Sequence, residues 1–191
     1  MASTKMKHMA TTRQTILNKK TGEKITWLET AADTGGKRLV FHFEVAPRGR
    51  LPVMHFHPHQ TETLELSKGF LTVNHGDKST ILTAGERIVI GKGVPHQWCN
   101  ASFDTAAEMT VTFEPALNTE TFLEQFYGLS NDDKTAEDGT PAFLQLMAMV
   151  NEYQVYVQGP PLFLQKIMGW VLGGVGRLIG YKKYYSRYRE S

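Results

Sequence analysis

The segment His55-Phe56-His57-Pro58-His59-Gln60-Thr61-Glu62 gathers three imidazoles and a carboxylate in one short stretch of chain. In an extended strand, side chains two residues apart point to the same face, so His55 and His57 project together and Phe56 points away from them. Imidazoles bind zinc, iron, copper and nickel, and Glu62 adds a negative charge that favours a divalent cation. The segment therefore predicts part of a metal site.

A further imidazole ligand must come from elsewhere in the chain, and Gly93-Val94-Pro95-His96 supplies one. Pro95 restricts its own backbone and that of Val94, which would hold the turn that presents His96. We therefore expect His55, His57, Glu62 and His96 to bind one divalent ion. These residue types do not decide between iron, manganese, nickel, copper and zinc.

The spacing of these residues resembles the first of the two sequence motifs of the cupin family. That motif reads Gly, five residues, His-x-His, four residues, Glu, six residues, Gly. Here its positions are occupied by Gly49, His55, His57, Glu62 and Gly69, and every spacing is met.

The second cupin motif reads Gly, five residues, Pro, one residue, Gly, two residues, His, three residues, Asn. Gly85, Gly93, His96 and Asn100 match it, whereas Gly91 stands where the family usually has Pro. That departure loosens a turn and removes no ligand. The resemblance covers about residues 14–115, and it implies that the four ligands lie inside a small jelly-roll β-barrel.

Short segments with strand character alternate with turn sequences at a spacing near ten residues throughout this region. Such a pattern is typical of an antiparallel sandwich or barrel. Residues 39–45 alternate most clearly, with Leu39, Phe41, Phe43 and Val45 on one face of the expected strand. The pattern thus predicts a mainly β fold, in agreement with the resemblance.

Six residues are candidates for a substrate pocket: His42, Phe43, Phe56, His59, Phe70 and Trp98. His42 either lines the cavity or alternates outward. His59 would share the face of His55 in an extended strand, but Pro58 can redirect it toward solvent, and we interpret it as a supporting residue rather than a fifth ligand. The aromatic candidates disfavour a sugar phosphate as substrate, because phosphate groups need cationic partners.

Three regions are expected along the chain. Residues 1–13 show no hydrophobic periodicity and are predicted to be disordered, and residues 14–115 form the barrel. Residues 116–191 are predicted to be a helical extension with a basic C-terminal tail. Helices are expected from Asn118, a good N-cap, and over residues 141–157 and 162–181.

The segment 162–181 is apolar and carries glycines at small-xxx-small spacing. The uncharged run between Lys166 and Arg177 is ten residues, short of the ~20 that span a bilayer. Two interpretations stay open. A helix here either docks on the barrel or on the second copy of a homodimer, which we prefer, or residues 162–191 contact a membrane surface, where the basic residues would favour anionic lipid.

The chain has 191 residues and a net charge of +2, which suits one domain and argues against a nucleic-acid partner. Cys99 is the only cysteine, so an internal disulfide is ruled out. No apolar signal segment is visible near the N-terminus. A cytoplasmic protein is therefore expected, with peripheral membrane association as the variant that the last segment suggests.

A site with three His and one Glu holds a divalent metal and leaves coordination positions open for chemistry. We therefore expect a metal-dependent enzyme acting on a small organic substrate, with a dioxygenase-type oxidoreductase as the preferred activity. Two alternatives are a metal-dependent isomerase or cyclase and a barrel that binds or senses a ligand without catalysis. No catalytic acid or base is identified beyond the ligands.

Overall fold

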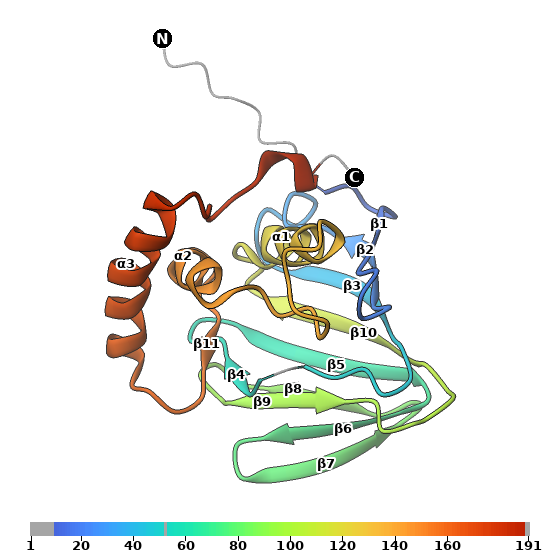
Figure 1. The fold of residues 1–191 in the computed structure, drawn as a ribbon. Coiled ribbons are helices and arrows are strands. Elements are labelled where there is room, and N and C mark those ends of the chain that lie inside the picture. The colour runs from blue at the N-terminus through green and yellow to red at the C-terminus, as the bar shows by residue number, and fades with distance from the viewer. Residues whose placement is uncertain (1–9, 52, 190–191) are drawn as a thin grey trace.

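The computed structural model describes residues 10–51 and 53–189, which form two antiparallel sheets and a helical C-terminal part (Figure 1). The first sheet has the strand order β1 (Thr15–Leu17), β2 (Lys24–Glu29), β3 (Leu39–Val45), β10 (Ala107–Glu114), β5 (Thr61–Lys68), β8 (Arg87–Ile90). The second has the order β11 (Tyr156–Val157), β4 (His55–Phe56), β9 (His96–Cys99), β6 (Phe70–His75), β7 (Lys78–Thr83). The helices are α1 (Thr119–Asn131), α2 (Phe143–Tyr153), α3 (Leu162–Leu178) and a 3-10 turn, η1 (Ser186–Arg189).

The apolar core lies between the two sheets and follows the alternation read from the sequence. Leu39, Phe41, Phe43 and Val45 of β3 are all buried, while the residues between them are partly exposed. Phe43 of the first sheet meets Trp98 of the second edge to face, with ring centroids 5.4 Å apart. Alternation with a period of two therefore places one face of β3 in the core. The mainly β fold with a C-terminal helical part is confirmed.

The helix predicted over residues 141–157 is shorter than expected. It ends at Tyr153, where Gln154 adopts a left-handed conformation with φ 56° and its N–H bonds to the carbonyl of Val150. Tyr156 and Val157 instead form β11, which pairs with β4. The prediction was wrong for these last residues because a β-rich sequence found an unpaired strand edge beside it.

The segment 162–181 is helical to Leu178. It packs mainly on α2, and Gln165 also bonds to Val157 of β11 in the second sheet. Glycines make the close approach possible: a Cβ on Gly169 would lie 2.5 Å from the Val150 side chain, and one on Gly176 would lie 2.8 Å from the Leu144 carbonyl oxygen. A Cβ on Gly173 would overlap the carbonyl of Met147. Figure 1 shows α3 on the side of α2 that faces away from the strands.

The basic C-terminal segment returns to α1 instead of extending freely. Arg189 is buried, and its Nε donates to Glu124 at 3.0 Å while Nη2 donates to Thr121 at 2.9 Å. Glu120 of the same helix accepts from the backbone N–H of Ala10 and of Ala31. α1 thus connects both ends of the described chain to the first sheet.

The segment 1–13, predicted to be disordered, falls mostly on residues 1–9, which lie outside the described residues. Of the remainder, Ala10 packs in the core and the N–H of Arg13 donates to the Trp27 carbonyl of β2 at 2.7 Å. In the described part of the chain, none of the helices combines the length and the apolar character needed to cross a membrane.

The close contact between α2 and α3 makes a prediction with a matched control. Gly173→Ala should lower the free energy of unfolding by about 1–3 kcal/mol, because the new methyl group overlaps the α2 backbone. Gly174→Ala, one residue on, should raise it by about 0.5–1 kcal/mol through helix propensity, because its Cβ would meet only Arg177 at 3.9 Å. Urea unfolding of the two variants measures the difference, and equal effects would contradict the packing described.

Candidate metal centre

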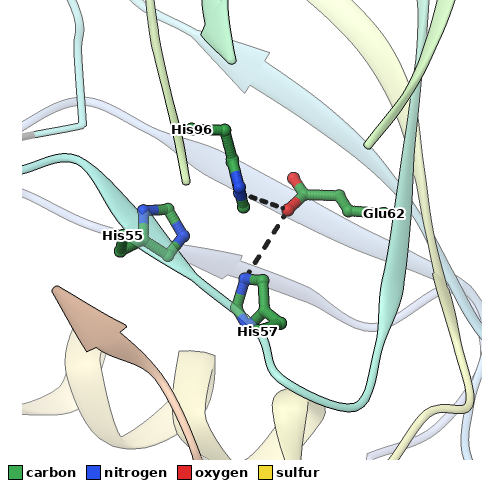
Figure 2. Close-up of side chains that lie close together, drawn as sticks. All are labelled: His55, His57, Glu62 and His96. Atoms are coloured by element: carbon green, nitrogen blue, oxygen red, sulfur yellow. Dashed lines mark hydrogen bonds and ion pairs between the residues drawn. The ribbon is translucent and has the colours of Figure 1, made fainter. Parts of the chain in front are cut away.

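The four predicted ligands lie together inside the barrel (Figure 2). His55, His57, Glu62 and His96 each offer one ligand atom, and these atoms all lie within 4.8 Å of one another. His57, Glu62 and His96 are buried and His55 is partly exposed, so the cluster reaches solvent on the His55 side. The arrangement brings three imidazoles and one carboxylate to a single point.

Strand pairing explains why these residues meet. β4 pairs with β9 so that His55 stands directly opposite His96, and their ring centroids are 4.4 Å apart. His57 follows two residues after His55 and projects to the same side, with ring centroids 5.0 Å apart. Glu62 comes from β5 in the other sheet, so the ligands join the two sheets across the barrel.

The second-motif turn is held against the ligand strand by the backbone. The N–H of Gly93 donates to the carbonyl of His57 at 2.9 Å. Gly93 has a φ of 73°, a left-handed conformation that glycine adopts without strain. Gly91 stands at the motif position where the cupin family usually has Pro. A Cβ there would make only an ordinary contact, so the packing around Gly91 does not require a glycine. The substitution of Gly for Pro at that motif position leaves the turn in place.

Hydrogen bonds fix the orientation of His96. Its Nδ1 lies 3.0 Å from the carbonyl oxygen of Val94, which can only accept, so Nδ1 carries a proton and Nε2 faces the cluster. Nε2 lies 2.9 Å from Oε2 of Glu62. Burial opposes protonation of His96, but the hydrogen bond and the charge of Glu62 outweigh it and raise its pKa. Glu62 thus attracts positive charge to the centre of the cluster.

The other two imidazoles are held in the neutral form that binds metals. Burial lowers the pKa of His55 to about 3, and the neighbouring His57 and His96 add to the effect. Burial, followed by the charge of His96, lowers the pKa of His57 to about 3 as well. Both rings therefore present free lone pairs at neutral pH, as metal ligation requires.

His57 supplies the observation that best tests whether a cation fits. Both of its ring nitrogens are buried and neither has a hydrogen-bond partner among the described residues. Its Nε2 lies 3.6 Å from Oε2 of Glu62, too far for a hydrogen bond. A buried polar atom without a partner costs about 1–3 kcal/mol, and a cation between His57 and the other ligands would satisfy it. The donor set therefore fits a divalent metal.

Two residues that support the cluster were not predicted. Phe113 of β10 stands opposite Glu62 in the strand register, and its ring packs edge to face against His57 at 5.2 Å between centroids. Gln60 is buried, and its side-chain amide donates to the carbonyls of Pro115 and Ala116 and to the Thr119 hydroxyl. Alternation along residues 108–113 could have pointed to Phe113, because it places Phe113 on the face of Val111 and Met109.

The last residue of the second motif has a structural role. Asn100 is buried, and its Nδ2 donates to the carbonyls of Val45, Ala46 and Thr105. Its own N–H donates to the Gly49 carbonyl at 2.8 Å. Asn100 therefore joins the start of the first motif to the end of the second, close to the ligand strand.

Of the predicted pocket residues, Phe43 and Trp98 lie inside the barrel. Both are buried, and Trp98 lies two residues beyond His96 on the same face of β9. They give the interior beside the cluster an apolar aromatic wall.

The structure does not bring the other pocket candidates to the cluster. His42 lies on the opposite face of β3 from Phe43, with its Nε2 3.7 Å from Glu108. Phe56 packs near Tyr156 of β11, with ring centroids 6.0 Å apart. His59 is exposed in the bend after the ligand strand, and Phe70 is 50% exposed.

Comparison with known proteins points to one family. Residues 41–113 match the family model described as a cupin domain. A search of curated proteins gives no match.

Several solved structures are similar to part of this chain. One is described as a sugar phosphate isomerase from a cupin superfamily, from Silicibacter pomeroyi (17% identity, covering 55% of this chain and 72% of that chain, TM-score 0.47). Another is an RmlC-like cupin from Shewanella frigidimarina (20% identity, covering 57% of this chain and 91% of that chain, TM-score 0.46). A third is a predicted oxalate decarboxylase from Thermotoga maritima (17% identity, covering 49% of this chain and 80% of that chain, TM-score 0.46).

The matched residues include all four members of the cluster. Residues 41–113 therefore match a cupin domain, and the two antiparallel sheets and the motif residues of this region agree with that match.

Proposed function

We propose that this protein is a metal-dependent cupin enzyme that acts on a small organic substrate, with dioxygenase-type oxidoreductase chemistry. The observation that carries the proposal is the largely buried cluster of His55, His57, Glu62 and His96. Among the described residues, neither ring nitrogen of His57 has a hydrogen-bond partner. A group that costs stability and finds no partner within the protein is typical of a functional site.

The side chains of the cluster would hold the metal, and the barrel would shape its surroundings. Neutral His55 and His57 and the carboxylate of Glu62 supply donors, and Val94 fixes the ring of His96 so that Nε2 points inward. A bound redox-active divalent ion would supply open coordination positions for substrate and O₂. The aromatic rings of Phe113 and Trp98 exclude water from the buried side.

Substrate would approach from the side of His55, the partly exposed ligand. An open hollow of about 540 Å³ is lined by Val53, two residues before His55, and by residues of the segment 134–142. The backbone carbonyl of Val53 accepts a hydrogen bond from the His55 imidazole. Phe43 and Trp98 still favour an apolar or weakly charged substrate over a sugar phosphate, whereas Phe56 and Phe70 no longer bear on that choice.

Metal affinity should depend on His57 and not on His59, so His57→Leu is the test variant and His59→Leu is its matched control. Wild-type protein purified without chelator should contain close to one divalent metal per chain, and His57→Leu should lose at least about 100-fold in metal affinity. His59→Leu should keep the metal, because His59 is exposed and outside the cluster. Elemental analysis and metal titration measure both, with circular dichroism as the check of folding.

The thermal midpoints should separate a metal role from a packing role. In excess chelator, His57→Leu should be at least as stable as wild type, because it removes two buried nitrogens that lack partners. With saturating metal the order should reverse, because binding stabilises only the form that retains the site. A His57→Leu variant that is less stable by the same amount in both conditions would show that His57 serves packing alone.

Oxygen uptake tests the reaction class. Iron-loaded protein should consume O₂ with at least one member of a panel of small organic acids, thiols and phenols, while zinc-loaded protein and iron-treated His57→Leu should not. An oxygen electrode and mass analysis of products make the measurement.

Each alternative activity has its own signature in the same assay. Product formed without O₂ by the zinc-loaded protein would replace the proposal with an isomerase or cyclase. Panel compounds that raise the thermal midpoint of every metallated form and are never turned over would replace it with a binding barrel.

A further inference from the structure

The side of α3 that faces away from α2 is apolar and exposed. Gly169, Gly173 and Gly176 fix one side of the helix against α2, so the opposite side must face outward. This outer face of α3 carries Phe163, Ile167, Trp170, Val171, Leu178 and the following Ile179, all of them exposed. Trp170 is 75% exposed and Leu178 is 88% exposed. A contiguous apolar face of this kind marks an interaction site.

The charges around the outer face are all of one sign. Residues 153–189 contain no Asp or Glu and six basic residues: Lys166, Arg177, Lys182, Lys183, Arg187 and Arg189. The last three pair with carboxylates from α1, α2 or the turn after α1. In the described part of the chain, no carboxylate forms an ion pair with Lys166, Arg177 or Lys182. Uncompensated positive charge therefore lies beside the apolar surface.

Helix geometry places part of this charge along one border of the outer face. At about 100° per residue, Lys166 and Arg177 lie within about 20° of each other around the axis, and Trp170 lies about 20–40° from both. An apolar face that carries a tryptophan and is bordered by basic side chains is the pattern of helices that lie in a membrane interface.

We propose that the outer face of α3 docks this protein on an anionic membrane surface, with the helix lying in the plane of the interface. The apolar residues enter the boundary between headgroups and acyl chains, and Lys166 and Arg177 meet anionic headgroups. The position of α3 at the outside of the molecule leaves this face free to approach a flat surface (Figure 1). The inference is independent of the proposed function.

A second copy of the chain is the main competing occupant, and charge disfavours it. If the outer face paired with itself about a twofold axis, Lys166 and Arg177 of both copies would border one interface. No carboxylate from residues 153–189 would be there to neutralise them. Like charges brought together at a desolvated interface oppose association.

The tryptophans provide a direct reporter of docking. The chain has three tryptophans; Trp27 and Trp98 are 0% and 3% exposed, and Trp170 is 75% exposed. Mixing wild-type protein with vesicles of 70:30 phosphatidylcholine and phosphatidylglycerol should shift the emission to the blue and protect it from acrylamide. Trp170→Phe should abolish the shift and still cosediment with the vesicles, which assigns the signal to the outer face.

Paired variants then separate the apolar and the electrostatic contributions. Trp170→Ser with Leu178→Ser should lower the partition coefficient onto these vesicles at least about tenfold. Lys166→Gln with Arg177→Gln should lower it about 30-fold on anionic vesicles and leave the weaker binding to pure phosphatidylcholine unchanged. Ile81→Ser with Phe103→Ser removes two exposed apolar side chains outside the extension, 66% and 76% exposed, and should leave binding to the vesicles unchanged.

Three results would overturn the proposal. One is the absence of cosedimentation and of any emission shift with anionic vesicles. Another is equal binding to anionic and to neutral vesicles. The third is a dimer in sedimentation velocity that Trp170→Ser with Leu178→Ser dissociates, which would assign the outer face to a second copy.

Discussion

The burial of His57, Glu62 and His96 between two sheets, beside the partly exposed His55, is the constraint on which the rest of the barrel depends. Burial removes these side chains from water, and hydrogen bonds within the protein offset only part of the free-energy cost. Glu62 bonds to His96, and Val94 bonds to His96 from the other side, but His57 has no hydrogen-bond partner in the part of the chain that the structure describes. Because burial already holds His55 and His57 neutral, the cluster is prepared for a cation rather than for an internal ion pair.

The cluster of His55, His57, Glu62 and His96 was predictable because most of its spacing is local in the sequence. The alternation of His55 and His57 and the spacing to Glu62 need only a strand and a short bend, and the structure joins them to His96 by one pairing of β4 with β9. The pocket was less predictable, since which face of a strand points inward is decided by the whole sheet. On β3 the aromatic residues face the interior, because burying Phe41 and Phe43 stabilises the fold more than burying His42 would.

Residues far from the motifs in sequence could not be placed by spacing at all. Phe113 reaches His57 only because β10 lies beside β5 in a register that sets it opposite Glu62. The strand β11 is the clearest case. A strand of two residues has almost no periodicity to detect, and the helix predicted over residues 141–157 included both of them. What determined β11 was the open edge of β4, a property of the folded sheet and not of the local sequence.

That edge makes the helical extension part of the site. β4 has only two residues, and β11 pairs His55 with Val157, while the N–H of Gln158 donates to the Met54 carbonyl. Gln165 of α3 holds Val157 in turn, since its side-chain amide accepts from the Val157 N–H and donates to the Val157 carbonyl. A continuous series of hydrogen bonds thus runs from α3 through β11 to the backbone of a ligand residue. Because so short a strand has little pairing of its own, the position of His55 depends on the extension as much as on the barrel.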